Sequence, residues 1–177
     1  MHSLILTLIS IGLLAALATA SVTYVPWWQR DASNTEAIVD SGMRKLERAF
    51  QLHAKAHADT PAPALGGADG GLAANFQAYL GFVPAAPAGF AWAYGVRPND
   101  GTAYSNMSYF CLYPAESGAG QMGKVRGIYR FAAYAGQGQA VYSNTTCGAI
   151  SNTAMASEFP QSVRLTYYVP YVAGMSE

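Results

Sequence analysis

His53 and His57 lie four residues apart in a stretch with helical periodicity. On a helix, that spacing brings the two rings to one side, where they could chelate a single metal ion. No third ligand is evident in the sequence, and the adjacent alanines and lysine favour a solvated surface, so we expect surface rings and no bound metal. The only other histidine is His2. Because no serine or cysteine can be paired with a base, we expect a protein that is not an enzyme and carries no cofactor.

A second candidate motif is the glycine-rich segment GAGQMGKV at 118–125. It fits G-x-G-x-x-G, and it differs from the phosphate loop G-x-x-x-x-G-K-[ST] only at Val125, which has no hydroxyl for magnesium. A phosphate loop also needs a helix N-terminus at this point to meet the anion. The residues that follow alternate like a strand, so we expect a hairpin loop.

The charge balance argues against nucleic acid as a partner. Ten basic and ten acidic residues cancel, and charged residues make up only 11% of the 177. A protein that neutralises several phosphates needs clustered Lys and Arg, and no such cluster occurs in the sequence. A near-neutral chain instead meets little self-repulsion when copies associate.

Cys111 and Cys147 are the only cysteines, and they lack the spacing of metal ligands. In an exported chain such a pair indicates one disulfide, for which loop entropy gives about 3–4 kcal/mol of stabilisation. Two buried free thiols are the alternative.

The opening stretch has no Asp, Glu, Lys or Arg before Arg30. As a helix rising ~1.5 Å per residue, 3–25 would span about 30 Å, the thickness of the hydrocarbon layer of a bilayer. A secretory signal peptide is the alternative, because 4–17 could form its apolar region and Ala18-Thr19-Ala20 has the form of a cleavage site. No Lys or Arg precedes that apolar region, however, and we expect the working protein to keep this helix.

Two residues should weaken the helix along its length. Pro26 lacks a backbone donor and clashes with the preceding turn, so the helix should kink or loosen there, and Gly12 weakens it upstream. Trp27 and Trp28 then stand where an interfacial aromatic belt would lie.

Beyond Asp31, apolar residues at intervals of 4, 3 and 4 predict an amphipathic helix that ends near Ala58. The members of this stripe, which we expect to pack on a sheet, are Val39, Met43, Leu46 and Phe50.

Residues 60–89 are rich in Gly, Pro and Ala and predict a connecting loop, interrupted by a short helix at 72–80. Beyond it, alternation of β-branched and aromatic residues with small or charged ones predicts strands. The expected strands are 90–96, 104–113, 124–133, 139–144 and 162–169. Because no helical pattern separates them, the sheet should be antiparallel, with one face covered by the stripe of the long helix.

These elements predict an α+β fold with one disulfide. A long N-terminal helix, apolar in its first half and amphipathic in its second, packs on an antiparallel sheet. The expected segments are the apolar helix half (1–29), the amphipathic helix half (30–59), the connecting loop (60–89) and the sheet head with the disulfide region (90–177).

This architecture resembles the mature subunits of type IV pili, and the sequence-specific part of the resemblance lies in residues 1–60. It implies a structural subunit that the apolar helix half holds in the inner membrane. Pilus assembly machinery then packs many copies into an extracellular filament, with 1–29 in its core. It also implies that a leader is cut before a methylated first residue, which is Met1 here.

The resemblance assigns further roles. Gly12 and Pro26 match the elements that let the helix loosen in the filament, and Cys111 with Cys147 matches the pair that closes the exposed C-terminal region. The family usually has glutamate at position five, where this chain has Ile5. The filament-core residues would be Leu4, Ile5, Leu8, Ile11, Leu14 and Leu17.

Two other functions fit the same residues. One is a minor pilin or membrane-anchored adhesin, whose sheet and loops would bind a surface or receptor. The other is a secreted domain that begins at Ser21 after removal of the first 20 residues.

Overall fold

The computed structural model describes residues 7, 9–15, 26–58, 60–116, 121–135, 139–153 and 163–169. The predictions for Met1, Leu4, Ile5, Leu8 and Leu17 lie outside these residues, as does the cleavage site at 18–20 that the signal-peptide alternative requires.

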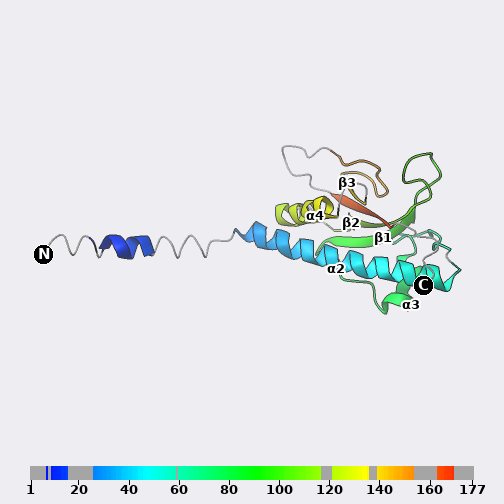
Figure 1. Ribbon diagram of the computed structural model, residues 1–177, viewed down its shortest axis with the longest axis horizontal. Helices are drawn as coiled ribbons and strands as arrows, with labels where there is room; N and C mark the ends of the chain where they lie inside the picture. Colours follow the sequence, from blue (N-terminus) through cyan, green and yellow to red (C-terminus); the bar gives the residue numbers. More distant parts are fainter. Residues whose placement is uncertain are drawn as a thin grey trace, which may run out of the picture.

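The described elements combine helices with an antiparallel sheet, as predicted (Figure 1). In chain order from residue 26 they are α2 (Trp27–Ala56), α3 (Leu72–Leu80), β1 (Phe90–Val96), β2 (Ser108–Pro114), α4 (Met122–Tyr134), β3 (Ala140–Ser143) and β4 (Arg164–Val169). The strands lie in the order β1-β2-β4-β3, and each neighbouring pair is antiparallel. The α+β fold with one disulfide is therefore confirmed.

The long N-terminal helix is only partly described. Residues 9–15 are helical, and the helix α2 begins at Trp27, directly after Pro26. The backbone of Pro26 is extended, with φ −53° and ψ 134°. Helical continuity between 15 and 26 stays a prediction.

The stripe of α2 lies in the core of the head. Val39, Met43, Leu46 and Phe50 are at most 1% exposed and belong to the main apolar cluster. From the sheet, side chains such as Phe110, on β2, meet this stripe, with the ring of Phe110 edge-on to Phe50 at 6.5 Å. Burying side chains of this size is worth about 1.5–3 kcal/mol each. This packing is the main attachment between helix and sheet.

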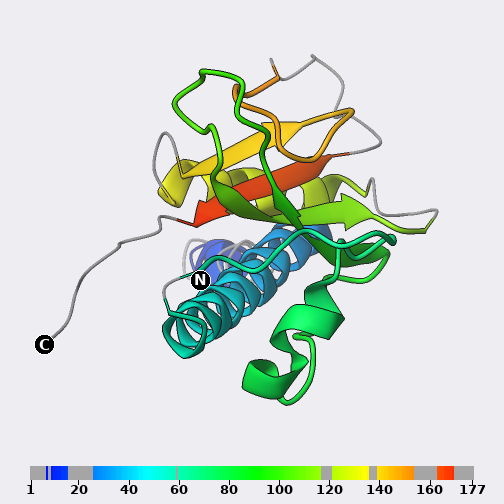
Figure 2. The ribbon, with the colours of Figure 1, turned by 90° about the vertical axis from the view of Figure 1, so that its right-hand side faces the viewer.

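Loops cover the opposite side of the central strands. Alternate residues of β4 point there, and the hydroxyl of Thr166 accepts a hydrogen bond from the amide of Gly148 at 2.9 Å. The ring of Tyr168 stacks on Tyr104 at 4.3 Å, between the ring centroids. The head therefore has helices on one side of the sheet and the loops 97–107 and 144–150 on the other (Figure 2).

Local sequence signals identified most of the remaining elements. Helix α3 and strand β1 coincide with the predicted 72–80 and 90–96, while β2, β3 and β4 lie within or close to their predicted ranges. Asp69 caps α3 by accepting hydrogen bonds from the amides of Gly71 and Ala73, both at 3.1 Å.

The strand predicted at 124–133 was wrong, because this segment forms the helix α4. Its buried Val125, Ile128, Tyr129 and Ala132 follow helical spacing, whereas Ala133, which the alternating pattern placed on the buried side, is exposed. A helix connects β2 to β3, yet every pair of neighbouring strands is antiparallel. This is possible because β3 is the outer strand and does not pair with β2, since β4 lies between them.

Helices α2 and α4 approach closely because α4 presents glycine at the crossing. A Cβ atom built on Gly127 would lie 2.5 Å from the backbone oxygen of Ala32 and 2.7 Å from Cβ of Thr35. One turn earlier, a Cβ on Gly123 would lie 2.5 Å from Oδ2 of Asp31. Two glycines four residues apart thus make one smooth side of α4, against which α2 packs.

We predict that Gly127→Leu lowers the free energy of unfolding by about 1–3 kcal/mol, since the side chain must push against backbone atoms. The gain in helix propensity of up to about 1 kcal/mol only partly offsets this loss. Urea unfolding followed by circular dichroism measures the change. The matched control is Gly66→Leu, where no atom lies within 4 Å of a Cβ, and it should stay within about 0.5 kcal/mol of the wild type. Equal stability of the two variants would contradict the crossing.

The predicted disulfide is confirmed: Cys111 on β2 bonds to Cys147, 36 residues later. We predict that the double variant C111A/C147A loses about 3–4 kcal/mol of unfolding free energy, because the open chain gains loop entropy. Denaturant unfolding of the variant and of the wild type with and without reductant measures this. Reductant should lower the unfolding midpoint of the wild type to that of the variant and leave the variant's midpoint unchanged. A wild-type midpoint that does not change with reductant would refute the prediction.

Candidate functional site

The helical stretch at 9–15 exposes large apolar side chains. Ile9, Ile11, Leu13 and Leu14 are between 57% and 67% exposed. Ile9 and Leu13, four residues apart, share one side of the helix, whereas Ile11 and Leu14 point to roughly the opposite side. Every residue from 9 to 15 is exposed, so apolar surface is uncovered on two opposite sides of this stretch. Gly12 lies in the same turn, with no atom within 4 Å of a Cβ built on it.

No helix among the described residues is long and apolar enough to cross a bilayer. Of the predicted filament-core residues, the structure describes Ile11 and Leu14 alone, and both are exposed.

The two tryptophans at the start of α2 differ in environment. Trp27 is 68% exposed. The ring of Trp28 lies under the guanidinium of Arg126 on α4, 4.3 Å from its carbon to the ring centroid, which is within the range of a cation–π contact. Trp28 therefore helps to hold α4 on α2, and of the two tryptophans only Trp27 is largely exposed.

The disulfide lies beside an ordered polar loop. Arg97 donates hydrogen bonds to the carbonyl of Gly148 and to the carboxylate of Asp100, so it ties the loop after β1 to the loop that contains Cys147. The Thr102 hydroxyl donates to Asp100 at 2.7 Å, and hydrogen bonds from Thr102 and then from Ser105 hold the pKa of Asp100 well below its usual range. This loop face is polar, solvent-exposed and tied together by these hydrogen bonds.

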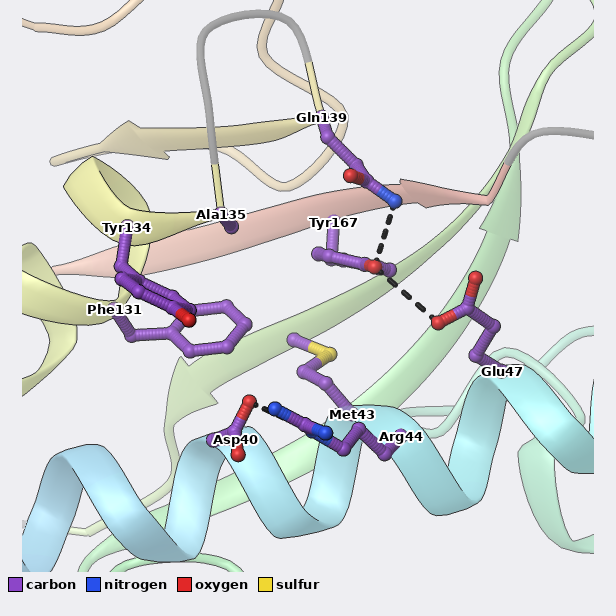
Figure 3. A pocket seen from close by; sticks show the side chains of 9 residues that line it. All are labelled: Asp40, Met43, Arg44, Glu47, Phe131, Tyr134, Ala135, Gln139 and Tyr167. Carbon is purple, nitrogen blue, oxygen red and sulfur yellow. Dashed lines mark hydrogen bonds and ion pairs between the residues drawn. The ribbon is translucent and has the colours of Figure 1, made fainter.

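A groove runs between α2 and α4 (Figure 3). One end, of about 350 Å³, is floored by Tyr167, whose hydroxyl donates to Glu47 at 3.3 Å and accepts from Gln139 at 2.7 Å. Burial, and then the charge of Glu47, raise the pKa of Tyr167 to about 12. The groove continues along α2 past Asp40 and Arg44, which form an exposed ion pair at 3.0 Å.

The described residues of this groove do not pair a nucleophile with a histidine base. Two of its three acids are engaged, Asp40 by Arg44 and Glu47 by Tyr167, the third being Glu36, and neither histidine nor cysteine is among its described lining residues. A tyrosine with a raised pKa stays protonated and serves as a hydrogen-bond donor. The sequence did not reveal the groove, because one of its walls is the helix α4, which the alternating pattern had placed in the sheet.

The strand expected after the glycine-rich motif 118–125 was wrong, because a helix, α4, begins within the motif. Its Gly123 and Lys124 lie in the first turn of α4, while 117–120 lie outside the described residues. Lys124 donates to the carbonyl of Ala88 at 2.9 Å, and the carboxylate of Asp31 lies against Gly123. An anionic side chain already lies at this helix N-terminus, which disfavours a phosphate there.

The surface position expected for both histidines was wrong for His53. Its ring is 7% exposed and meets the rings of Phe76 and Tyr79, both on α3, at 5.5 and 5.7 Å. His57 stacks on it from the solvent side, with ring centroids 4.1 Å apart. The covering helix α3 was predicted, but its contact with α2 could not be. Among the described residues, no group of three or more His, Cys, Asp or Glu side chains could hold a metal.

No protein-family model, no curated protein and no solved structure matches this chain. Its function therefore has to be argued from its own residues.

Burial, and then the charge of His57, lower the pKa of His53 below its usual value near 6.5. The unfolded chain thus binds a proton at His53 before the folded chain does. We predict that stability is full above about pH 7 and declines as the pH falls through about 6.5 towards the lowered folded pKa. The decline should be smaller in His53→Phe.

Urea midpoints between pH 8 and pH 5 measure this dependence. His2→Gln, which also removes one histidine, should keep the wild-type decline. The same decline in His53→Phe and wild type would rule out His53 as its source.

Proposed function

We propose that this chain is a structural subunit of a type IV pilus-like extracellular filament, and that its N-terminal helix holds it in the inner membrane before assembly. The observation that carries the proposal is the helical stretch at 9–15, whose large apolar side chains are exposed on two opposite sides. A helix that is apolar on opposite sides cannot be covered by packing one face on the head, so it needs apolar partners around it.

The head supports this proposal because its own core is already closed. Helix α2 buries its stripe under the sheet, and α3 and α4 complete the cluster. Among the described residues, none of the apolar cluster of the head covers Ile9, Ile11, Leu13 or Leu14, which all stay exposed. Either lipid or copies of the same helix can provide that cover, at about 1.5–3 kcal/mol for each large side chain buried.

The remaining features suit repeated copies. Formal net charge is zero, so that stacking subunits meets little electrostatic repulsion. Helix α2 would continue the core helix as a spine, and the sheet with its disulfide-tied loops would face outwards. Such loops, constrained by Cys111–Cys147 and Arg97, suit an exposed filament surface.

We predict that the double variant L13Q/L14Q is lost from the membrane fraction and from sheared filaments, because two amides would have to be buried without partners in an apolar core. Fractionation and immunoblotting of cells that make each variant measure this. The matched control is Leu65→Gln, which changes one exposed leucine of the head (45% exposed) and should leave both fractions populated.

Both variants should keep the wild-type circular dichroism and melting temperature, since neither site lies in the core. Normal membrane retention and filament incorporation of L13Q/L14Q would contradict the proposal.

A further inference from the structure

The two histidines at the end of α2 form a compact pair on one side of the helix. Their ring centroids lie 4.1 Å apart, with 15° between the ring planes. His53 comes from the last turn of α2, and His57 is the residue that ends it. Neither residue belongs to the apolar stripe of α2 or to the proposed filament contacts.

The orientation of His57 is set by a backbone hydrogen bond. Its Nδ1 lies 2.9 Å from the carbonyl oxygen of His53. A carbonyl can only accept, so Nδ1 must carry the proton, and Nε2 keeps its lone pair. Histidines that bind metals are held in this way, by donating the second ring N–H to a carbonyl or carboxylate. His57 is exposed, so its Nε2 can be reached from solvent.

The position of His53 is set by packing. Phe76 and Tyr79, both on α3, contact its ring edge-on, and the ring is only 7% exposed. Its Nδ1 is buried with no hydrogen-bond partner. A buried nitrogen without a partner costs free energy, and an ion coordinated by Nδ1 itself would offset that cost.

We propose that His53 and His57 together bind one divalent transition-metal ion. Two nitrogens at about 2.0–2.1 Å from a shared ion lie about 3 Å apart. The two ring planes are now nearly parallel, so the exposed His57 ring must tilt out of the stack before both lone pairs can point at one ion. Imidazole pairs suit Cu²⁺, Ni²⁺ and Zn²⁺, with Cu²⁺ bound most tightly.

Water completes the coordination on the exposed side, since no third His, Cys, Asp or Glu of the described residues joins the pair. The ion would connect His57, which ends α2, to His53 in the last turn of the same helix, whose ring contacts α3. This site is independent of the filament proposal.

The test is calorimetric titration of the purified full-length chain with CuCl₂ and with ZnCl₂, in wild type, His57→Ala and His2→Gln. His57 is exposed, so its removal should leave the fold intact, as the melting temperature in chelator will verify. His2→Gln is the essential control, because His2 beside the terminal amine could itself bind Cu²⁺, and these three are the only histidines in the chain.

We expect one equivalent of Cu²⁺ to bind, Zn²⁺ to bind more weakly, and His57→Ala to weaken both by at least about tenfold, the smallest loss seen when even an outer contact of a metal ligand is removed. His2→Gln should retain the wild-type affinity. Failure of the wild type to bind, undiminished binding by His57→Ala, or binding that disappears only in His2→Gln would each overturn the proposal.

Discussion

One side of α2 is buried along most of its length, and the rest of the head is attached to that side or to elements that it supports. The sheet rests on Val39, Met43, Leu46 and Phe50, and α3 closes over its C-terminal end around His53. The N-terminal half is held by α4, through glycines that allow backbone contact. Helix α2 contacts the sheet, α3 and α4 at once. The small residues that let α2 and α4 approach closely therefore matter as much as the large residues of the apolar stripe.

The sequence predicted the elements whose signals are local. Strong alternation identified β1, an apolar stripe identified α2, and α3 coincides with the short helix predicted within the Gly-, Pro- and Ala-rich connection. Helix α4 was missed for a physical reason: it contains Gly123 and Gly127, which weaken helix propensity by about 1 kcal/mol each and obscure its apolar pattern. Those glycines are explained only by the crossing with α2, which is a tertiary contact that no local pattern contains.

Among the candidate functional features, too, those with a local sequence signal were predicted and those that depend on a second helix were missed. The cysteine pair was found because a chain with two cysteines has one possible pairing. The groove and the burial of His53 were missed, since each depends on where a second helix lies: α4 for the groove and α3 for the histidine. The unusual apolar character of the opening stretch was evident from the sequence, and the exposure of Ile9, Ile11, Leu13 and Leu14 agrees with it.

The central claim is that the working protein keeps an apolar N-terminal helix and uses it to assemble. The most direct test is the intact mass and N-terminal peptide of the native protein, taken from both sheared-filament and soluble fractions. Our account predicts a chain that starts at Met1 with one additional methyl group, found in the sheared material. A chain that starts at Ser21, found in the soluble fraction, would contradict the account, because the stretch that carries the proposal would then be a discarded signal peptide.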